Sequence, residues 1–160
     1  MALDYAARAT ASGKSLGLTP IDIVEVEARK PGKAAEGEAL LANRAVGVRL
    51  ETSQAVEDLT YDLSRLPVIA LVIPRFRDGR SFTAARLLRE RYGFTGEIRA
   101  IGEVLREQAY HMVRCGFDAF MPSDGSDPAT WAAAVSRFRH VYQRAADPRI
   151  PAYVERGSGA

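Results

Sequence analysis

Val68-Ile69-Ala70-Leu71-Val72-Ile73 is an unbroken run of six apolar residues, and prolines flank it at Pro67 and Pro74. Four of the six are β-branched, and a run this short between two prolines is typical of a strand. A strand with apolar residues on both faces indicates a parallel sheet that is covered on both sides. The run therefore predicts a buried central strand of an α/β domain.

The same kinds of pattern continue in both directions from this run. Strands are predicted at residues 21–27, 46–50, 97–101 and 118–121. Helices are predicted at residues 34–44, 54–65, 81–92 and 103–114, and a last one opens at Asp127-Pro128. Gly93 and Gly116, each followed by phenylalanine, are expected to end their helices in left-handed caps.

Strands that alternate with helices must run parallel, with right-handed crossovers. The predicted fold class is therefore α/β, built from successive βα units with a mainly parallel sheet. The periodicity is equally compatible with an open, flavodoxin-like sheet and with half of a barrel.

The 160 residues fit one domain. We expect a flexible N-terminal arm at residues 1–20, a single α/β domain at 21–146 and a mobile C-terminal tail at 147–160. The last helix should carry an apolar stripe, which could belong to the core or to a homo-oligomer face. Its members are Trp131, Val135, Phe138 and Tyr142.

The charge is small overall but unevenly placed. The formal net charge is +2, which does not indicate a nucleic-acid partner. Residues 75–106, however, hold eight arginines and four acidic residues. The single cysteine, Cys115, excludes a disulfide scaffold, and no signal peptide or membrane span is evident, so a cytoplasmic protein is expected.

Ligands of parallel α/β folds collect at the carboxyl ends of the strands. This rule selects the loops at residues 74–81, 102–106 and 122–126. The first loop places arginines at a helix N-terminus, which favours an anion or an acidic partner, although the arginines could also pair with local carboxylates. The candidate anion- or partner-binding residues are Arg75, Arg77, Arg80, Ser81, Arg99 and Arg106.

Asp78 and Glu103 are the candidates for acid–base catalysis, because they follow neighbouring strands. No cofactor is evident, since the chain has no glycine-rich dinucleotide fingerprint and too few cysteines for an iron–sulfur cluster. His111 and His140 lie far apart without partner ligands, so no metal site is predicted.

Two long stretches carry a family resemblance. They are Leu66-Pro67-Val68-Ile69-Ala70 with Ile73-Pro74-Arg75-Phe76-Arg77-Asp78-Gly79-Arg80-Ser81-Phe82, and Gly96-Glu97-Ile98-Arg99-Ala100-Ile101-Gly102-Glu103-Val104-Leu105-Arg106. Over about residues 46–122 the chain resembles a bacterial family of unknown function whose members are labelled probable oxidoreductases of sulfite reduction.

The resemblance implies a role in assimilatory sulfite reduction. The leading hypothesis is an accessory protein whose arginine-rich edge binds an acidic partner, such as sulfite reductase or its electron donor, or a sulfur oxyanion. The alternative is a small α/β enzyme that acts on an anionic substrate, with Asp78 or Glu103 as the acid–base group.

Overall fold

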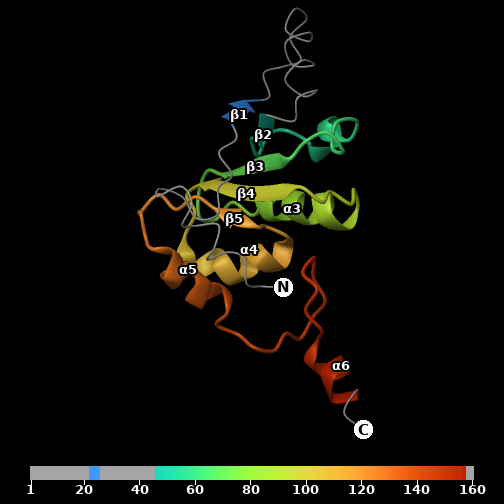
Figure 1. The fold of residues 1–160 in the computed structure, drawn as a ribbon, viewed down its shortest axis with the longest axis vertical. Coiled ribbons are helices and arrows are strands. Elements are labelled where there is room, and N and C mark those ends of the chain that lie inside the picture. The colour runs from blue at the N-terminus through green and yellow to red at the C-terminus, as the bar shows by residue number, and fades with distance from the viewer. Residues whose placement is uncertain (1–21, 26–45, 158–160) are drawn as a thin grey trace, which may run out of the picture.

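The protein is seen here in a computed structural model, which describes residues 22–25 and 46–157. A five-stranded sheet organises these residues (Figure 1). Its strands are β1 (Asp22–Glu25), β2 (Val46–Leu50), β3 (Val68–Ile73), β4 (Glu97–Gly102) and β5 (Ala119–Phe120). Every neighbouring pair is parallel, so the predicted α/β class is confirmed. The expected arm at residues 1–20 and helix at 34–44 lie outside the described residues.

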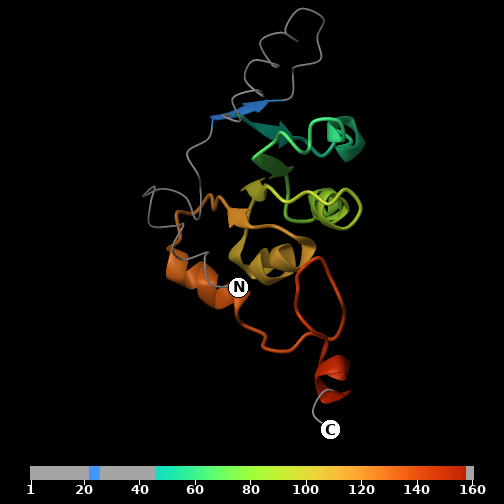
Figure 2. The same ribbon diagram turned by 45° about the vertical axis from the view of Figure 1, so that its right-hand side comes forward.

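The strands follow one another in the sheet in chain order. A flavodoxin-like sheet would instead have the order 2-1-3-4-5. Here each strand is added on the same side of the one before it, as in a segment of a barrel. With right-handed crossovers, this order places all the connecting helices on one face of the sheet. Figure 2 shows α3 (Arg80–Glu90) and α4 (Ala109–Cys115) together on that face.

β3 is buried along its whole length, as its apolar run predicts. Ile69, Leu71 and Ile73 join the main core, which also contains Leu88 of α3 and Met112 of α4. The alternate residues Ala70 and Val72 belong to a second apolar cluster with Ile101 of β4. Both faces of β3 are therefore withdrawn from water, which explains the absence of polar residues in the run.

The two glycine caps are confirmed. Gly93 and Gly116 have φ angles of 62° and 103°, which glycine adopts without strain. The phenylalanine after each cap, Phe94 or Phe117, is buried in the main core. Each cap thus ends a helix and starts the return to the next strand.

Two helix predictions need correction. Residues 54–65 form only a 3-10 turn, η1 (Val56–Leu59), followed by further turns. Thr60 shows the cause, because its hydroxyl donates to the carbonyl of Glu57 at 2.7 Å, and short polar side chains of this kind compete with helical hydrogen bonds. The helix predicted at 103–114 starts later, as η2 (Arg106–Gln108) followed by α4.

The last predicted helix is shorter than its apolar stripe. Asp127 caps α5 (Pro128–Val135) as predicted, accepting a hydrogen bond from the Thr130 N–H at 3.0 Å. Trp131 is buried and stacks on Phe120 of β5 at 5.1 Å. Phe138 and Tyr142 lie beyond the helix end, so they do not belong to one helical stripe.

The packing also continues past the expected domain end at residue 146. The side chain of Asp147 is buried, and the backbone N–H of Ala146 donates to the carbonyl of Arg114 in α4 at 3.0 Å. Pro151 and Ala152 are buried too, at the start of α6 (Ala152–Gly157). Within the part of the chain that the structure describes, no helix has the length and apolarity required to cross a membrane.

Candidate functional site

The loops that follow β3, β4 and β5 lie at one edge of the sheet, as the sequence predicts. The first two loops are joined by hydrogen bonds. The backbone N–H of Phe76 donates to Glu103 Oε2 at 3.0 Å, and Gln108 Nε2 donates to the Phe76 carbonyl at 3.1 Å. These contacts hold both sides of the Phe76 backbone, so the first loop has a fixed position over the second.

The third loop approaches the same place. The hydroxyl and the backbone N–H of Ser126 both donate hydrogen bonds to the Asp124 carboxylate, and these bonds lower the pKa of Asp124. The nearby charge of Arg106 lowers this pKa further. Arg106 in η2 is therefore within electrostatic reach of the third loop. The three loops form one surface, which we call the carboxyl edge.

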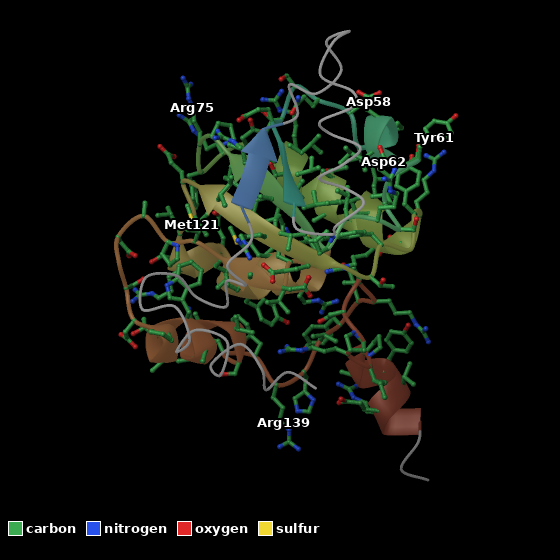
Figure 3. The ribbon with its side chains drawn as sticks, turned by 45° about the horizontal axis from the view of Figure 1, so that its top comes forward. Asp58, Tyr61, Asp62, Arg75, Met121 and Arg139 are labelled. Atoms are coloured by element: carbon green, nitrogen blue, oxygen red, sulfur yellow. The ribbon has the colours of Figure 1, made fainter. Side chains whose placement is uncertain are left out.

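Arg75 and Arg77 are exposed at the carboxyl edge, and Figure 3 shows Arg75 pointing away from the molecule. Arg80 is different, because Asp78 neutralises it. Arg80 Nη2 lies 2.6 Å from Asp78 Oδ2 and Arg80 Nε lies 3.0 Å from Asp78 Oδ1, a bidentate pair. Asp78 Oδ1 also accepts the Arg80 N–H at 3.2 Å. The Asp78 carboxylate thus already accepts a hydrogen bond from the first backbone N–H of α3.

Two of the predicted binding residues lie away from the carboxyl edge. Ser81 is buried and donates its hydroxyl to the carbonyl of Val72 within β3. Arg99 is in the middle of β4, beside Ala70 of β3, where it is 2% exposed and its Nη2 lies 2.7 Å from Glu97 Oε1. Both residues therefore support the sheet, and neither points into the loops.

The two acid–base candidates have structural contacts. The hydrogen bonds from Arg80 lower the pKa of Asp78 to about 2. This carboxylate is ionised at neutral pH and is a weak proton acceptor there. Glu103 accepts the Phe76 N–H, as described above, so it fixes a loop. A catalytic role for either residue stays a prediction.

The low pKa of Asp78 predicts a pH effect of definite sign. Because the folded-state pKa is below the unfolded value of 3.8, this group stabilises the fold above that value. The stabilisation is lost as the pH falls through about 2. In an NMR titration of the carboxyl carbons, Asp78 should titrate near 2 in the native chain and higher in Arg80→Ala, but still below 3.8, because the backbone N–H of residue 80 continues to donate to Asp78. An unchanged midpoint in this variant would contradict the assigned cause.

Apolar side chains of the carboxyl edge were not predicted as site residues. Phe76, Leu105 and Met121 follow β3, β4 and β5, and they are 50%, 37% and 43% exposed. Phe76 lies between Arg75 and Arg77 and Leu105 precedes Arg106, whereas Met121 lies between Phe120 and Pro122. A large apolar residue beside arginines in a loop is typical of a contact surface, and this is the signal by which the sequence could have revealed Phe76 and Leu105.

Cys115 is a poor candidate for a reactive thiol. Burial raises its pKa, and its Sγ lies 3.8 Å from His111 Nε2. Within residues 22–25 and 46–157, no three His, Cys, Asp or Glu side chains gather as metal ligands would.

A family model described as "bacterial protein of unknown function (DUF934)" matches residues 47–153. The chain belongs to this family. The DUF934 region extends beyond the resemblance at residues 46–122, because it also covers α5 and the segment around Asp147. The whole carboxyl edge lies within it.

Short matches to other curated proteins cover a smaller part of the chain. Ribosomal RNA large subunit methyltransferase H is 75% identical over 40 residues in Caulobacter vibrioides and 70% identical over 40 residues in Caulobacter sp. strain K31. The same enzyme of Phenylobacterium zucineum is 64% identical over 39 residues. These matches cover 24–25% of this chain and 25–26% of the enzymes, so the chain spans about a quarter of their length.

Proposed function

We propose that this DUF934 protein is an accessory protein of assimilatory sulfite reduction that binds an acidic partner protein through its carboxyl edge. The proposal rests on one observation above all. Exposed apolar side chains lie at the ends of three adjacent strands, with cationic side chains beside them after β3 and β4. They are Arg75, Phe76, Arg77, Leu105, Arg106 and Met121.

This composition favours a protein over a small oxyanion as the ligand. Interfaces are enriched in aromatic residues, methionine and arginine, with apolar anchors surrounded by a polar rim. A sulfate or sulfite ion would gain no binding energy from contact with the apolar side chains of Phe76 or Met121. Arg75 and Arg77 would meet carboxylates of the partner and accelerate its approach.

The loop that carries Phe76 is already ordered by Glu103 and Gln108. Binding would therefore cost little additional ordering of this backbone, which favours affinity. The nature of the partner comes from the family resemblance, which implies sulfite reductase or its electron donor.

The enzyme alternative has weaker support from the geometry. Asp78 is paired with Arg80 and ionised, and Glu103 holds the Phe76 loop. The lowered pKa of Asp78 is the opposite of what suits a general acid at neutral pH.

The proposal is tested by measuring the affinity of the purified chain for sulfite reductase and, separately, for its electron donor. We expect the double reversal Arg75→Glu/Arg77→Glu and the single change Phe76→Ala each to weaken binding about tenfold or more. The charge reversal should also reduce the dependence of the affinity on salt, since the rim charges act through screened electrostatics.

Arg139→Glu/Arg144→Glu is the matched control. Both arginines are exposed and follow α5, and Figure 3 shows Arg139 far from Arg75. This variant should bind as the native chain does. Equal affinity of the Arg75→Glu/Arg77→Glu chain, or failure of the native chain to bind either protein, would reject the proposal.

A further inference from the structure

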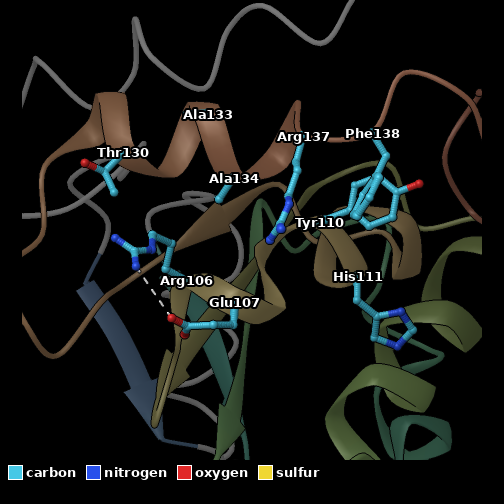
Figure 4. A pocket seen from close by; sticks show the side chains of 9 residues that line it. All are labelled: Arg106, Glu107, Tyr110, His111, Thr130, Ala133, Ala134, Arg137 and Phe138. Atoms are coloured by element: carbon cyan, nitrogen blue, oxygen red, sulfur yellow. Dashed lines mark ion pairs between the residues drawn. The ribbon is translucent and has the colours of Figure 1, made fainter.

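A groove of about 520 Å³ lies between η2–α4 on one side and α5 on the other (Figure 4). This volume is within the range of small-molecule sites. The groove is lined by aromatic, cationic and small side chains. They are Arg106, Glu107, Tyr110, His111, Thr130, Ala133, Ala134, Arg137 and Phe138.

One wall of the groove consists of two aromatic rings held at a fixed angle. Tyr110 and Phe138 meet edge to face, with ring centroids 5.0 Å apart and planes at 69°. Arg149 supports both rings, because its guanidinium lies 5.3 Å from the Tyr110 centroid and its Nη1 donates to the Phe138 carbonyl at 3.0 Å. The wall is therefore formed before any ligand arrives, which reduces the cost of binding.

Arg149 is itself held by a buried carboxylate. Arg149 Nε lies 3.7 Å from Asp147 Oδ2, and Arg114 Nε of α4 lies 3.5 Å from Asp147 Oδ1. The Asp147 side chain is 4% exposed. Asp147 thus lies between an arginine of α4 and the arginine beside the aromatic wall, although burial raises the pKa of this carboxyl despite both charges.

The mouth of the groove is cationic. Figure 4 shows Arg137 reaching from the end of α5 across the groove towards η2 and α4. Its guanidinium lies 5.5 Å from the Phe138 centroid, and it makes no ion pair with any side chain in residues 46–157. Arg106 has Glu107 at 3.6 Å, but both side chains are at least half exposed, so this pair is weak. The two arginines outnumber the one carboxylate.

We propose that the groove binds an organic anion with a flat ring body. The ring would lie against Tyr110 and Phe138, beside the small side chains of Ala133 and Ala134, and the anionic group would meet Arg137 and Arg106. An inorganic anion would leave the ring wall exposed to water. The Thr130 hydroxyl already donates to Asp127 at 2.5 Å, so the two guanidinium groups, with the Tyr110 hydroxyl and the His111 ring, are the side-chain donors of the lining that can recognise the charge.

The experiment uses a pair of fluorescent probes that differ by one charge, with the full-length chain. Anilinonaphthalene sulfonate carries two ring systems and a sulfonate, and phenylnaphthylamine carries the same rings without it. We expect the sulfonate to bind about tenfold tighter than the neutral probe. Arg137→Gln should remove most of this preference and leave the neutral probe unaffected, whereas Phe138→Ala should weaken both probes.

Two control variants separate this site from the proposed partner surface. Arg139→Gln removes a neighbouring exposed charge, and Arg75→Gln/Arg77→Gln changes only the carboxyl edge. Both should bind the two probes as the native chain does, with unchanged melting temperatures confirming that all variants fold.

Equal affinity of the native chain for the two probes would overturn the proposal, and so would an Arg137→Gln variant that keeps the preference for the sulfonate. Sedimentation at two protein concentrations tests whether a second copy of the chain occupies the groove. If the chain self-associates and the probes dissociate the oligomer, a second copy fills the groove, and the proposal is rejected.

Discussion

Replacing Arg89 with alanine will lower the free energy of unfolding by at least about 3 kcal/mol, because it leaves three part-buried carbonyls without their donor and removes an ion pair with Asp118. The side chain is 16% exposed and ends at the amino edge of the sheet. It donates to the carbonyls of Gly116, Phe94 and Gly96 at 3.0, 2.5 and 2.8 Å and forms an ion pair with Asp118. One residue thus joins α3 to both glycine caps and to the start of β5.

Denaturant titration of the variant measures this loss directly, and the melting temperature should fall by roughly 10 °C or more. Arg86→Ala is the matched control on the same helix. Arg86 makes an exposed pair with Glu90 at 2.9 Å, and its removal should change stability by less than about 0.5 kcal/mol. A loss of less than about 1 kcal/mol in the Arg89 variant would show that water replaces its contacts.

Gly102→Ala should destabilise the fold by about 2–5 kcal/mol, because two penalties combine. Gly102 ends β4 with a φ of 99°, a region that side chains rarely adopt. A Cβ there would also lie 2.4 Å from the carbonyl oxygen of Ile73 in β3. Since that contact is with backbone, the two strands must separate at the carboxyl edge.

Gly125→Ala and Gly79→Ala separate the cost of the positive φ angle from the cost of the steric contact. Gly125 has a φ of 66° and open space around its Cβ position, so its variant measures the conformational strain alone, about 1–2 kcal/mol. Gly79 has a φ of -85° and open space, so alanine there should be neutral or slightly stabilising. Thermal unfolding of the three variants checks the order. Equal losses at Gly102 and Gly125 would mean that the Ile73 contact relaxes at no cost.

Local signals in the sequence were sufficient for much of this fold. The apolar run of β3, the caps at Gly93 and Gly116, and the Asp127-Pro128 helix start each depend on residues close in sequence. Such signals retain their meaning wherever the element is placed. The α/β class follows from their alternation.

The order of the strands could not be obtained in this way. Whether β2 lies between β1 and β3 depends on which strand edge buries more apolar surface, a property of the assembled sheet. Arg99 is a different case. It lies within residues 97–101, which the sequence predicts as a strand, and the strand pairing places it opposite Ala70, within the sheet and away from the carboxyl edge.

The candidate site was predicted in part. The carboxyl edge and its exposed arginines follow from the rule for parallel sheets, and the structure adds the pairing of Arg80 with Asp78. The groove between α4 and α5 was missed. Its wall is formed by Phe138, whose side chain would face the core if the last helix were continuous as predicted. The wall also depends on Arg149, which lies in the segment predicted to be a mobile tail.

The chain-order sheet also bears on how the protein folds. Val48 pairs with Ile69, Val68 with Glu97 and Arg99 with Ala119, so paired residues lie roughly 20 to 30 positions apart. Parallel sheets usually fold slowly because distant segments must meet first. Here each strand needs only the unit before it, and closing a loop of that length has a modest entropic cost. The sheet can grow one unit at a time outward from β3, with no early search for a remote strand.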